Sequence, residues 1–223
     1  MIYNIAIDGP AGAGKSTIAK RVAKNLGFIY VDTGAMYRAM AVYFLDKGID
    51  VNDEDAVSRD CDNVNIMIEY KDNLQQVILN GENITSRLRT EEVGNTASAV
   101  AVYPAVRKKL VELQKELAKK TSVVMDGRDI GSCVLKDAVC KIYLTASVEC
   151  RALRRMAELQ EKGVDTSLEI IKADISDRDS RDMHRDVSPL IQAEDAVYLD
   201  SSDMGIEEVT DKIISIFNEK AGK

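Results

Sequence analysis

Apolar residues along the chain follow two spacings that alternate for most of its length. Short apolar runs of the kind that form buried strands lie at residues 2–7, 28–31, 122–125, 141–145 and 197–200. Between them, apolar residues recur with helical spacing, as at Ile18, Val22 and Leu26, which lie four positions apart, and this predicts helices. Strands that alternate with helices are typical of an α/β fold, so we expect a parallel sheet of about five strands wrapped by helices.

The predicted helices begin at residues that can cap them. Thr33 is expected to cap a helix that runs to about Lys47, and Asn52 or Asp53 a short helix that ends near Cys61. The first helix is expected over residues 16–26. Further helices are expected over residues 91–102 and 104–119, on both sides of a break at 163–165, and over 206–217.

One stretch, residues 64–85, departs from this α/β rhythm. Apolar residues alternate over 64–70, a turn is expected at 71–73, and a second strand at 74–79. Asn80-Gly81 is a strong turn signal and precedes a possible third strand at 83–85. These features predict an inserted small subdomain with an antiparallel sheet.

The segment between the first strand and the first helix, residues 9–17, matches the pattern G-x-x-x-x-G-K-[ST] and is here called the phosphate loop. Glycines in such a loop let backbone N–H groups point inward at phosphate oxygens. Lys15 is expected to reach the β- and γ-phosphates of a nucleotide, and the Ser16 hydroxyl to ligate Mg²⁺. An ordinary glycine-rich turn is the alternative, but the order of strand, loop and helix favours nucleotide binding. The predicted ATP-binding loop residues are Gly9, Pro10, Ala11, Gly12, Ala13, Gly14, Lys15, Ser16 and Thr17.

Polar residues also concentrate after two later strands. Asp-Gly-Arg-Asp-Ile-Gly at 126–131 follows a buried strand, where parallel sheets bind ligands, although a plain polar loop is the alternative. After the second strand, residues 32–38 lead into a helix on which Arg38 is placed to hold a second phosphate. As structure alone, this segment is a capped amphipathic helix.

Arginines form two stripes near the C-terminal third of the chain. Arg151, Arg154 and Arg155 share one predicted helical face, and Arg178, Arg181 and Arg185 another, with Asp182 on the same stripe. The alternative is a pair of solvated helices with ion pairs such as Arg178 to Asp182. We expect instead a mobile helical lid over phosphates. Arg107 lies in the first turn of a helix, where the dipole gives a cation no benefit, which favours a functional role.

Composition narrows the class of protein. A formal net charge of −7 argues against a general nucleic-acid binder, and no apolar stretch is long enough to span a membrane. The N-terminus lacks the basic run of a signal peptide. The cysteines at 61, 133, 140 and 150 form no C-x-x-C pair, and His184 is the single histidine, so we expect reduced thiols in a cytoplasmic protein and no zinc site.

Several segments together resemble the bacterial cytidylate kinases, a family of P-loop nucleoside monophosphate kinases. The resemblance covers nearly the whole chain, including the antiparallel insertion, and its least specific part is the phosphate loop. Ser16 and Thr33 stand where some family members carry Gly and Ser, and neither change removes a needed donor. The segments that carry the resemblance are 7–17, 32–38, 89–93, 126–131 and 178–185.

The resemblance implies roles for individual residues. Ser98, Arg107 and Asp129 would recognise cytosine, and Arg178 and Asp182 would contact the ribose. Arg151, Arg154 and Arg155 would lie near the lid, with the last two among the residues that bind ATP. The implied catalytic residues are Lys15, Arg128 and Arg185. The implied CMP-binding set is Thr33, Tyr37, Arg38, Ser98, Arg107, Arg128, Asp129, Arg178, Asp182 and Arg185.

The resemblance also implies a reaction and a domain plan. ATP with Mg²⁺ would phosphorylate CMP and dCMP by in-line transfer, with no nucleic-acid polymer or membrane as partner, and the protein is expected to be a monomer. The expected core comprises residues 1–35, 120–148 and 186–223, the monophosphate-binding region 36–119, and the lid 149–185.

Two other functions are compatible with a phosphate loop. A GTPase-type switch would need D-x-x-G after a strand and N-K-x-D for guanine, and neither string occurs. A P-loop kinase for another small acceptor, such as shikimate, AMP or UMP, remains open, because the identity of the base depends mainly on the resemblance.

Overall fold

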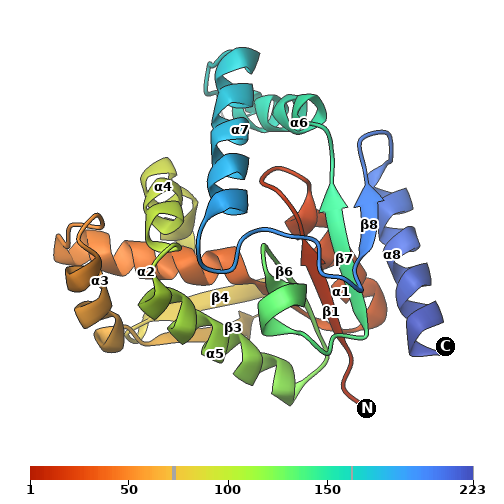
Figure 1. The fold of residues 1–223 in the computed structure, drawn as a ribbon, viewed down its shortest axis with the longest axis horizontal. Helices are drawn as coiled ribbons and strands as arrows, with labels where there is room; N and C mark the ends of the chain where they lie inside the picture. Colours follow the sequence, from red (N-terminus) through yellow and green to blue (C-terminus); the bar gives the residue numbers. More distant parts are fainter. Residues whose placement is uncertain (72–73, 162, 223) are drawn as a thin grey trace. The chain divides into compact units, whose positions relative to one another are not determined.

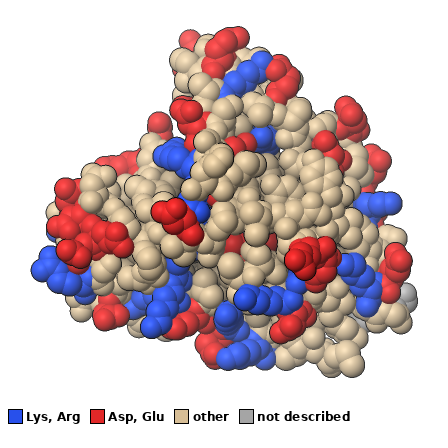
Figure 2. Space-filling view, viewed as in Figure 1, with Lys and Arg blue, Asp and Glu red and all other residues tan. Residues whose placement is uncertain are grey.

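A computed structural model describes residues 1–71, 74–161 and 163–222. The chain forms two compact units, which are described separately. Unit 1 comprises Met1–Tyr30 and Lys120–Lys223, and unit 2 comprises Val31–Lys119. Acidic and basic side chains are intermingled on the face drawn in Figure 2. Among the described helices, none combines the length and the apolar character needed to cross a membrane.

The main sheet has five strands in the order β2-β6-β1-β7-β8, which confirms the predicted α/β fold. Its central strand β1 (Asn4–Asp8) pairs in parallel with β6 (Val123–Gly127) and with β7 (Cys140–Thr145). β8 (Val197–Asp200) and β2 (Ile29–Asp32) lie at the two edges. Because parallel strands end at the same edge of the sheet, the segments after β1, β6 and β7 are neighbours.

The core of unit 1 lies between this sheet and two helices. α1 (Lys15–Leu26) and α8 (Ile206–Ala221) pack against each other, and they contact β6 and β7 respectively (Figure 1). Apolar side chains from strands and helices form one buried cluster, among them Ile5, Ile142, Val22 and Phe217. The alternation of buried runs and helical spacing in the sequence therefore corresponds to a real core.

Two further helices of unit 1 form a pair. α6 (Val148–Glu161) and α7 (Leu168–His184) pack against each other around Ala152, Ile171 and Ile175. Ser167 caps α7 by accepting a hydrogen bond from the Ile170 N–H. The predicted helix pair at the arginine stripes is confirmed, although α7 ends at His184, so Arg185 lies just beyond the helix.

Unit 2 combines helices with the predicted antiparallel insertion. Its helices are α2 (Thr33–Lys47), α3 (Glu54–Asp60), α4 (Glu91–Val100) and α5 (Pro104–Lys120). Its sheet has the order β3-β4-β5, formed by Ile66–Lys71, Leu74–Leu79 and Glu82–Asn83. Both pairings are antiparallel, and α2 packs against β4 and α4. Part of the predicted turn at 71–73 lies outside the described residues.

Two local predictions are corrected. Asp32, not Thr33, is the N-cap of α2: its carboxylate accepts a hydrogen bond from the Ala35 N–H at 3.0 Å, while Thr33 is already helical. Strand β6 continues through Asp126 and Gly127, which we assigned to a loop. Register with β1 extends the strand, because Asp8 lies opposite Gly127.

Candidate active site

The phosphate loop begins with a turn that only glycine can make. Gly9 has φ 149°, and a Cβ at this position would lie 1.9 Å from the carbonyl oxygen of Leu144 on β7. Gly14, within this loop, is the N-cap of α1 and has no side chain that could accept a hydrogen bond from the first N–H groups of the helix. A helix N-terminus of this kind favours a bound anion.

Lys15 lies inside this loop and is 6% exposed. Its Nζ donates a hydrogen bond to the Pro10 carbonyl at 2.6 Å. Burial holds the pKa of Lys15 well below its usual value, and the charge of Arg128 lowers it further against the opposing effect of Asp126. Two cations close enough to repel each other favour an anion between or beside them.

Ser16 and Asp126 meet at the ends of α1 and β6. The Ser16 hydroxyl donates to Asp126 Oδ2 at 2.9 Å, and the Tyr30 hydroxyl donates to Oδ1 at 2.8 Å. From the sequence we assigned no separate role to Asp126, although it is the first residue of the 126–131 segment. The available signal was its position as an acid at the end of a buried strand.

This oxygen pair fits Mg²⁺. The ion prefers hard oxygen donors, keeps several waters, and is held by one or two carboxylates together with substrate phosphates. Within the described part of the chain, no group of three or more His, Cys, Asp or Glu side chains could hold a metal. A hydroxyl and a carboxylate beside a phosphate loop are what a metal that arrives with a nucleotide needs.

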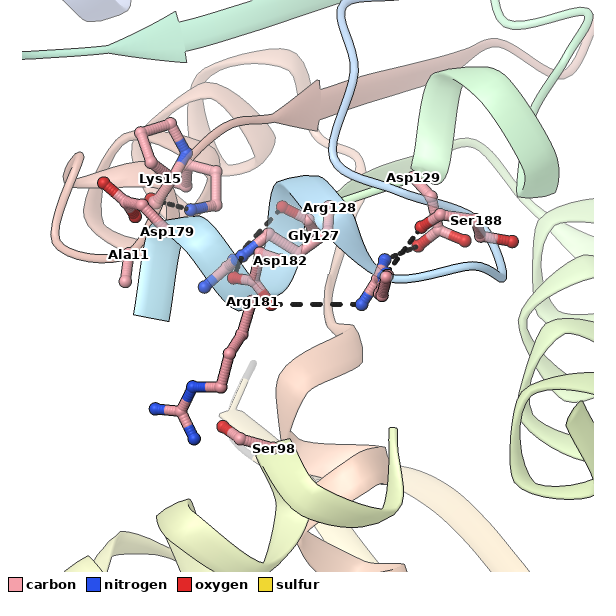
Figure 3. Close-up of polar contacts among 12 residues, drawn as sticks. Ala11, Lys15, Ser98, Gly127, Arg128, Asp129, Asp179, Arg181, Asp182 and Ser188 are labelled. Carbon is pink, nitrogen blue, oxygen red and sulfur yellow. Dashed lines mark hydrogen bonds and ion pairs between the residues drawn. The ribbon is translucent and has the colours of Figure 1, made fainter. Parts of the chain in front are cut away.

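A network of charged side chains joins the segment after β6 to the end of α7 (Figure 3). Arg128 Nε donates to Asp182 Oδ2 at 2.7 Å. Arg185 lies 3.9 Å from both Asp182 Oδ1 and Asp129 Oδ1, and its Nε donates to the Ser188 carbonyl at 2.7 Å. The structure therefore brings together four predicted site residues from two distant segments.

Asp182 is the centre of this network. Burial raises the pKa of its carboxyl, but the charge and hydrogen bond of Arg128 lower it more, with further contributions from Arg178 and Arg185, so the net direction is down. Asp182 thus stays ionised. Part of the positive charge of the arginines is already neutralised by this carboxylate.

The three arginines of α6 do not act as one stripe. Arg151 is buried, and its Nη1 donates to the Ala11 carbonyl at 2.9 Å and pairs with Asp179 Oδ2 at 2.7 Å. Arg154 Nη2 donates to the Ser201 carbonyl at 2.8 Å, which lies after β8. Arg155 is exposed and pairs with Glu158 on its own helix.

Arg151 is therefore a support for the phosphate loop. Its guanidinium connects α6, the Asp179 carboxylate on α7 and the backbone of Ala11. Asp179 could not be identified from the sequence, because nothing in the local pattern distinguishes it from its acidic neighbours.

The predicted site residues of unit 2 gather around α2 and the α4–α5 segment. Arg107 is buried, its guanidinium lies 5.8 Å from the centre of the Tyr37 ring, and it donates to the Ala101 carbonyl at 3.1 Å. Ser98 donates to the Gly94 carbonyl at 3.1 Å. A Cβ on Gly34 would lie 3.1 Å from Arg38 Nη1, so this glycine leaves room for the Arg38 side chain.

Comparison with known proteins gives a consistent result. The family model described as "Cytidylate kinase" matches residues 5–219. A cytidylate kinase of Lactobacillus johnsonii is 47% identical over 219 residues, covering 98% of this chain and 95% of the relative. One from Oceanobacillus iheyensis is 50% identical over 211 residues, covering 95% and 92%.

Solved structures of low sequence identity share the fold. An uncharacterized protein from Eubacterium ventriosum has a TM-score of 0.52 at 15% identity, covering 98% of this chain and 99% of its own. A gluconokinase from Sinorhizobium meliloti has a TM-score of 0.50 at 12% identity, covering 99% and 94%.

Proposed function

Because the chain belongs to the cytidylate kinase family, we propose that it transfers the γ-phosphoryl group of ATP to CMP and dCMP, giving CDP and dCDP. The observation that carries this proposal is that the buried Lys15 and the half-buried Arg128 are close enough for their charges to act on each other beside a glycine-lined loop. Such a site is suited to phosphoryl groups, which bring negative charge to both cations.

The reaction needs no general base. The nucleophile is an oxygen of the acceptor phosphate, which is largely ionised near neutral pH because its second pKa is about 6. Lys15 would hold the β- and γ-phosphates, while Arg38, Arg128 and Arg185 would hold the acceptor phosphate. Catalysis then consists of positioning and charge neutralisation around an in-line transfer.

Ser16 and Asp126 would hold Mg²⁺ together with ATP. The short distance of 2.9 Å between the Ser16 hydroxyl oxygen and Asp126 Oδ2 supports this assignment. When bound, Mg²⁺ neutralises charge on the phosphate oxygens. The phosphate loop, residues 9–17, would cradle the phosphates of ATP, with Arg154 and Arg155 as further candidates for ATP contacts. Arg151 acts indirectly, by holding the Ala11 carbonyl.

Base recognition would depend on complementary hydrogen bonds. Cytosine presents an N4 amine donor beside N3 and O2 acceptors, so Asp129 would accept from N4 while Arg107 donates to N3 or O2, with Ser98 as a further contact. Uracil reverses the donor at position 4 and leaves the aspartate unpaired, which is costly for a buried carboxylate. Arg178 and Asp182 would contact the ribose, with Thr33 and Tyr37 near the acceptor nucleotide.

The helix pair α6–α7 would act as a lid. Its closure would exclude water, which otherwise competes for the γ-phosphoryl group. Residues 149–185 form this lid in our proposal, residues 36–119 the monophosphate-binding region, and residues 1–35, 120–148 and 186–223 the core. We further propose a cytoplasmic monomer that acts on free nucleotides.

A coupled assay of ADP release tests the proposal. Turnover is expected with CMP and dCMP and should be much weaker with UMP, AMP and shikimate. Asp129→Ala should lower kcat/KM for CMP far more than for UMP, by roughly a hundredfold, because only cytosine donates to this carboxylate. Higher turnover with shikimate or AMP than with CMP would reject the assigned substrate, and an unchanged CMP/UMP ratio in the variant would remove Asp129 from base recognition.

A further inference from the structure

The segment that follows β6 contains an unusual turn directly after Asp129. Residues Ile130–Val134, labelled η3, form a π-helical turn in which the Leu135 N–H donates to the Ile130 carbonyl at 2.6 Å. Isolated π-turns are rare in proteins, and those that occur are often found at functional sites. The side chain of Asp129 does not cap this turn, so its first N–H groups need another acceptor.

Asp8 supplies that acceptor from the end of β1. Its Oδ1 accepts a hydrogen bond from the Ile130 N–H at 2.8 Å, and its Oδ2 accepts from the Gly131 N–H at 2.7 Å. The carboxylate lies 122 and 123 residues earlier in the chain than these two donors. Both oxygens are therefore used on two consecutive backbone groups.

The position of Asp8 leaves this carboxylate little freedom. It is 5% exposed, and its backbone lies opposite Gly127 in the β1–β6 pairing. A Cβ on Gly131 would lie 3.3 Å from Asp8 Oδ2 and 3.3 Å from Lys141 Cδ, so a glycine at 131 gives the carboxylate its close approach. The Lys141 ammonium points elsewhere, to the Lys136 carbonyl and to Asp195.

The chemistry of the contact requires a carboxylate. Two adjacent N–H donors need two acceptor oxygens, whereas the amide of asparagine offers one oxygen and would present its NH₂ group to the other donor. Asp129, the residue before the turn, has φ −144° and ψ 25°, which is neither helical nor extended. Its orientation therefore depends on how the following turn is held.

We propose that Asp8 is a positioning residue for base selection, which clamps the turn at Ile130 and Gly131 and thereby holds Asp129 where it can read the acceptor base. This inference rests on the proposed role of Asp129 in recognising cytosine. It assigns to a residue beside the phosphate loop an effect on the nucleotide that receives the phosphoryl group, and not on the one that donates it.

A competing role for Asp8 makes an opposite prediction. Asp8 immediately precedes Gly9, and its charge acts on Lys15, so it could instead support the ATP side of the site. In that case its loss would raise KM for ATP and lower kcat equally for every acceptor. A change in the preference for CMP over UMP therefore supports the first role, and a change in KM for ATP supports the second.

The test compares Asp8→Asn with Gly131→Ala, which disturbs the same contact from the other side. In both variants, the ratio of kcat/KM for CMP to that for UMP should fall by at least about tenfold. KM for ATP should change by less than about twofold. In Asp8→Asn, amide hydrogen exchange at Ile130 and Gly131 should become faster while exchange in α8 stays unchanged.

Two results would overturn the inference. One is an unchanged CMP/UMP ratio with a raised KM for ATP, and the other is unchanged exchange at both amides. If Asp8→Asn fails to fold, as judged by circular dichroism, Gly131→Ala decides by the same criteria.

Asp129→Ala assayed in parallel separates this inference from the proposed function. A changed ratio in Asp129→Ala with no change in Asp8→Asn rejects the clamp alone. No change in either variant rejects the role of Asp129 and the clamp together.

Discussion

The phosphate loop after β1 and the charged network after β6 and α7 would bind the same kind of charge by different means. In the phosphate loop, residues 9–17, the proposed binding groups are mainly backbone N–H groups, and the turn at Gly9 has no room for a side chain. In the charged network, the proposed binding groups are guanidinium ions, and Asp182 contacts both Arg128 and Arg185.

The difference explains which parts of a site a sequence reveals. A backbone site needs particular residue types at adjacent positions, so it can be read from a short string of residues. A side-chain site needs partners that orient each group, and these can lie anywhere in the chain. Arg151 shows this, because one of its partners is the carbonyl of Ala11, 140 residues away.

The largest effect is expected from Gly9→Ala. A Cβ would overlap the Leu144 carbonyl at 1.9 Å, so the loop and β7 must separate, and we expect a loss of more than about 4 kcal/mol in the free energy of unfolding. Gly48→Ala is the matched control: Gly48 has φ 63° but nothing within 4 Å, so only the left-handed backbone costs about 1 kcal/mol. Urea unfolding measures both, and equal losses would show that contact with β7 does not restrict the loop.

The next effect tests whether Arg151 stabilises the fold or contacts the nucleotide that we propose to bind here. Arg151→Met leaves the buried Asp179 carboxylate without its cation, which should cost about 3–5 kcal/mol. Arg155→Met removes an exposed pair with Glu158 and should change stability by less than about 0.5 kcal/mol. If Arg151→Met unfolds like the wild type but binds ATP weakly, the guanidinium acts on the nucleotide and our distinction fails.

The fold could be predicted further than the site. The range 74–79 coincides with β4 and 197–200 with β8, because apolar runs and turn residues act locally. The C-terminal end of β6 could not be predicted, because pairing with β1 extends the strand over Asp126 and Gly127, which we had assigned to a polar loop. Asp126 and Asp8 were missed as site residues because their donors, Ser16 and Ile130, lie 110 and 122 residues away.

Asp8 shares a feature with each region, because its carboxylate is a charged side chain that accepts hydrogen bonds from backbone N–H groups. Its ionisation should make the stability of the protein depend on pH. Burial raises the pKa of Asp8 to about 6, against the lowering effect of its hydrogen bonds from Gly131 and Ile130. A raised pKa means that the folded chain binds this proton more tightly than the unfolded chain does. The contribution of Asp8 to the free energy of unfolding is therefore greatest below the unfolded pKa of 3.8 and decreases as pH rises to about 6.

At about 1.4 kcal/mol per pKa unit, this decrease is roughly 3 kcal/mol. Asp8→Asn lacks the ionisation, so the difference in unfolding free energy between wild type and variant should change by that amount between pH 4 and pH 7. Urea titrations at both pH values measure it. Parallel curves for the two proteins would mean that Asp8 ionises as freely in the folded chain as in the unfolded one.

The smallest effect concerns the N-cap of α2. The preference for capping residues predicted Thr33, whereas the cap is the neighbouring Asp32. Asp32 accepts from the Ala35 N–H at 3.0 Å and pairs with Arg89 at 3.1 Å. Asp32→Ala should lower the unfolding free energy by about 1–2 kcal/mol, whereas Asp32→Asn keeps a capping oxygen and should lose less than about 0.5 kcal/mol.

The contrast between the two Asp32 variants separates the cap from the ion pair. The Arg89 side chain is 61% exposed, so the pair is screened by water and contributes little. If Asp32→Asn loses as much as Asp32→Ala in thermal unfolding, the charge outweighs the cap. In that case Asp32 would resemble the charged network, whose side chains depend on partners from distant segments, and not the phosphate loop, whose conformation depends on the local backbone.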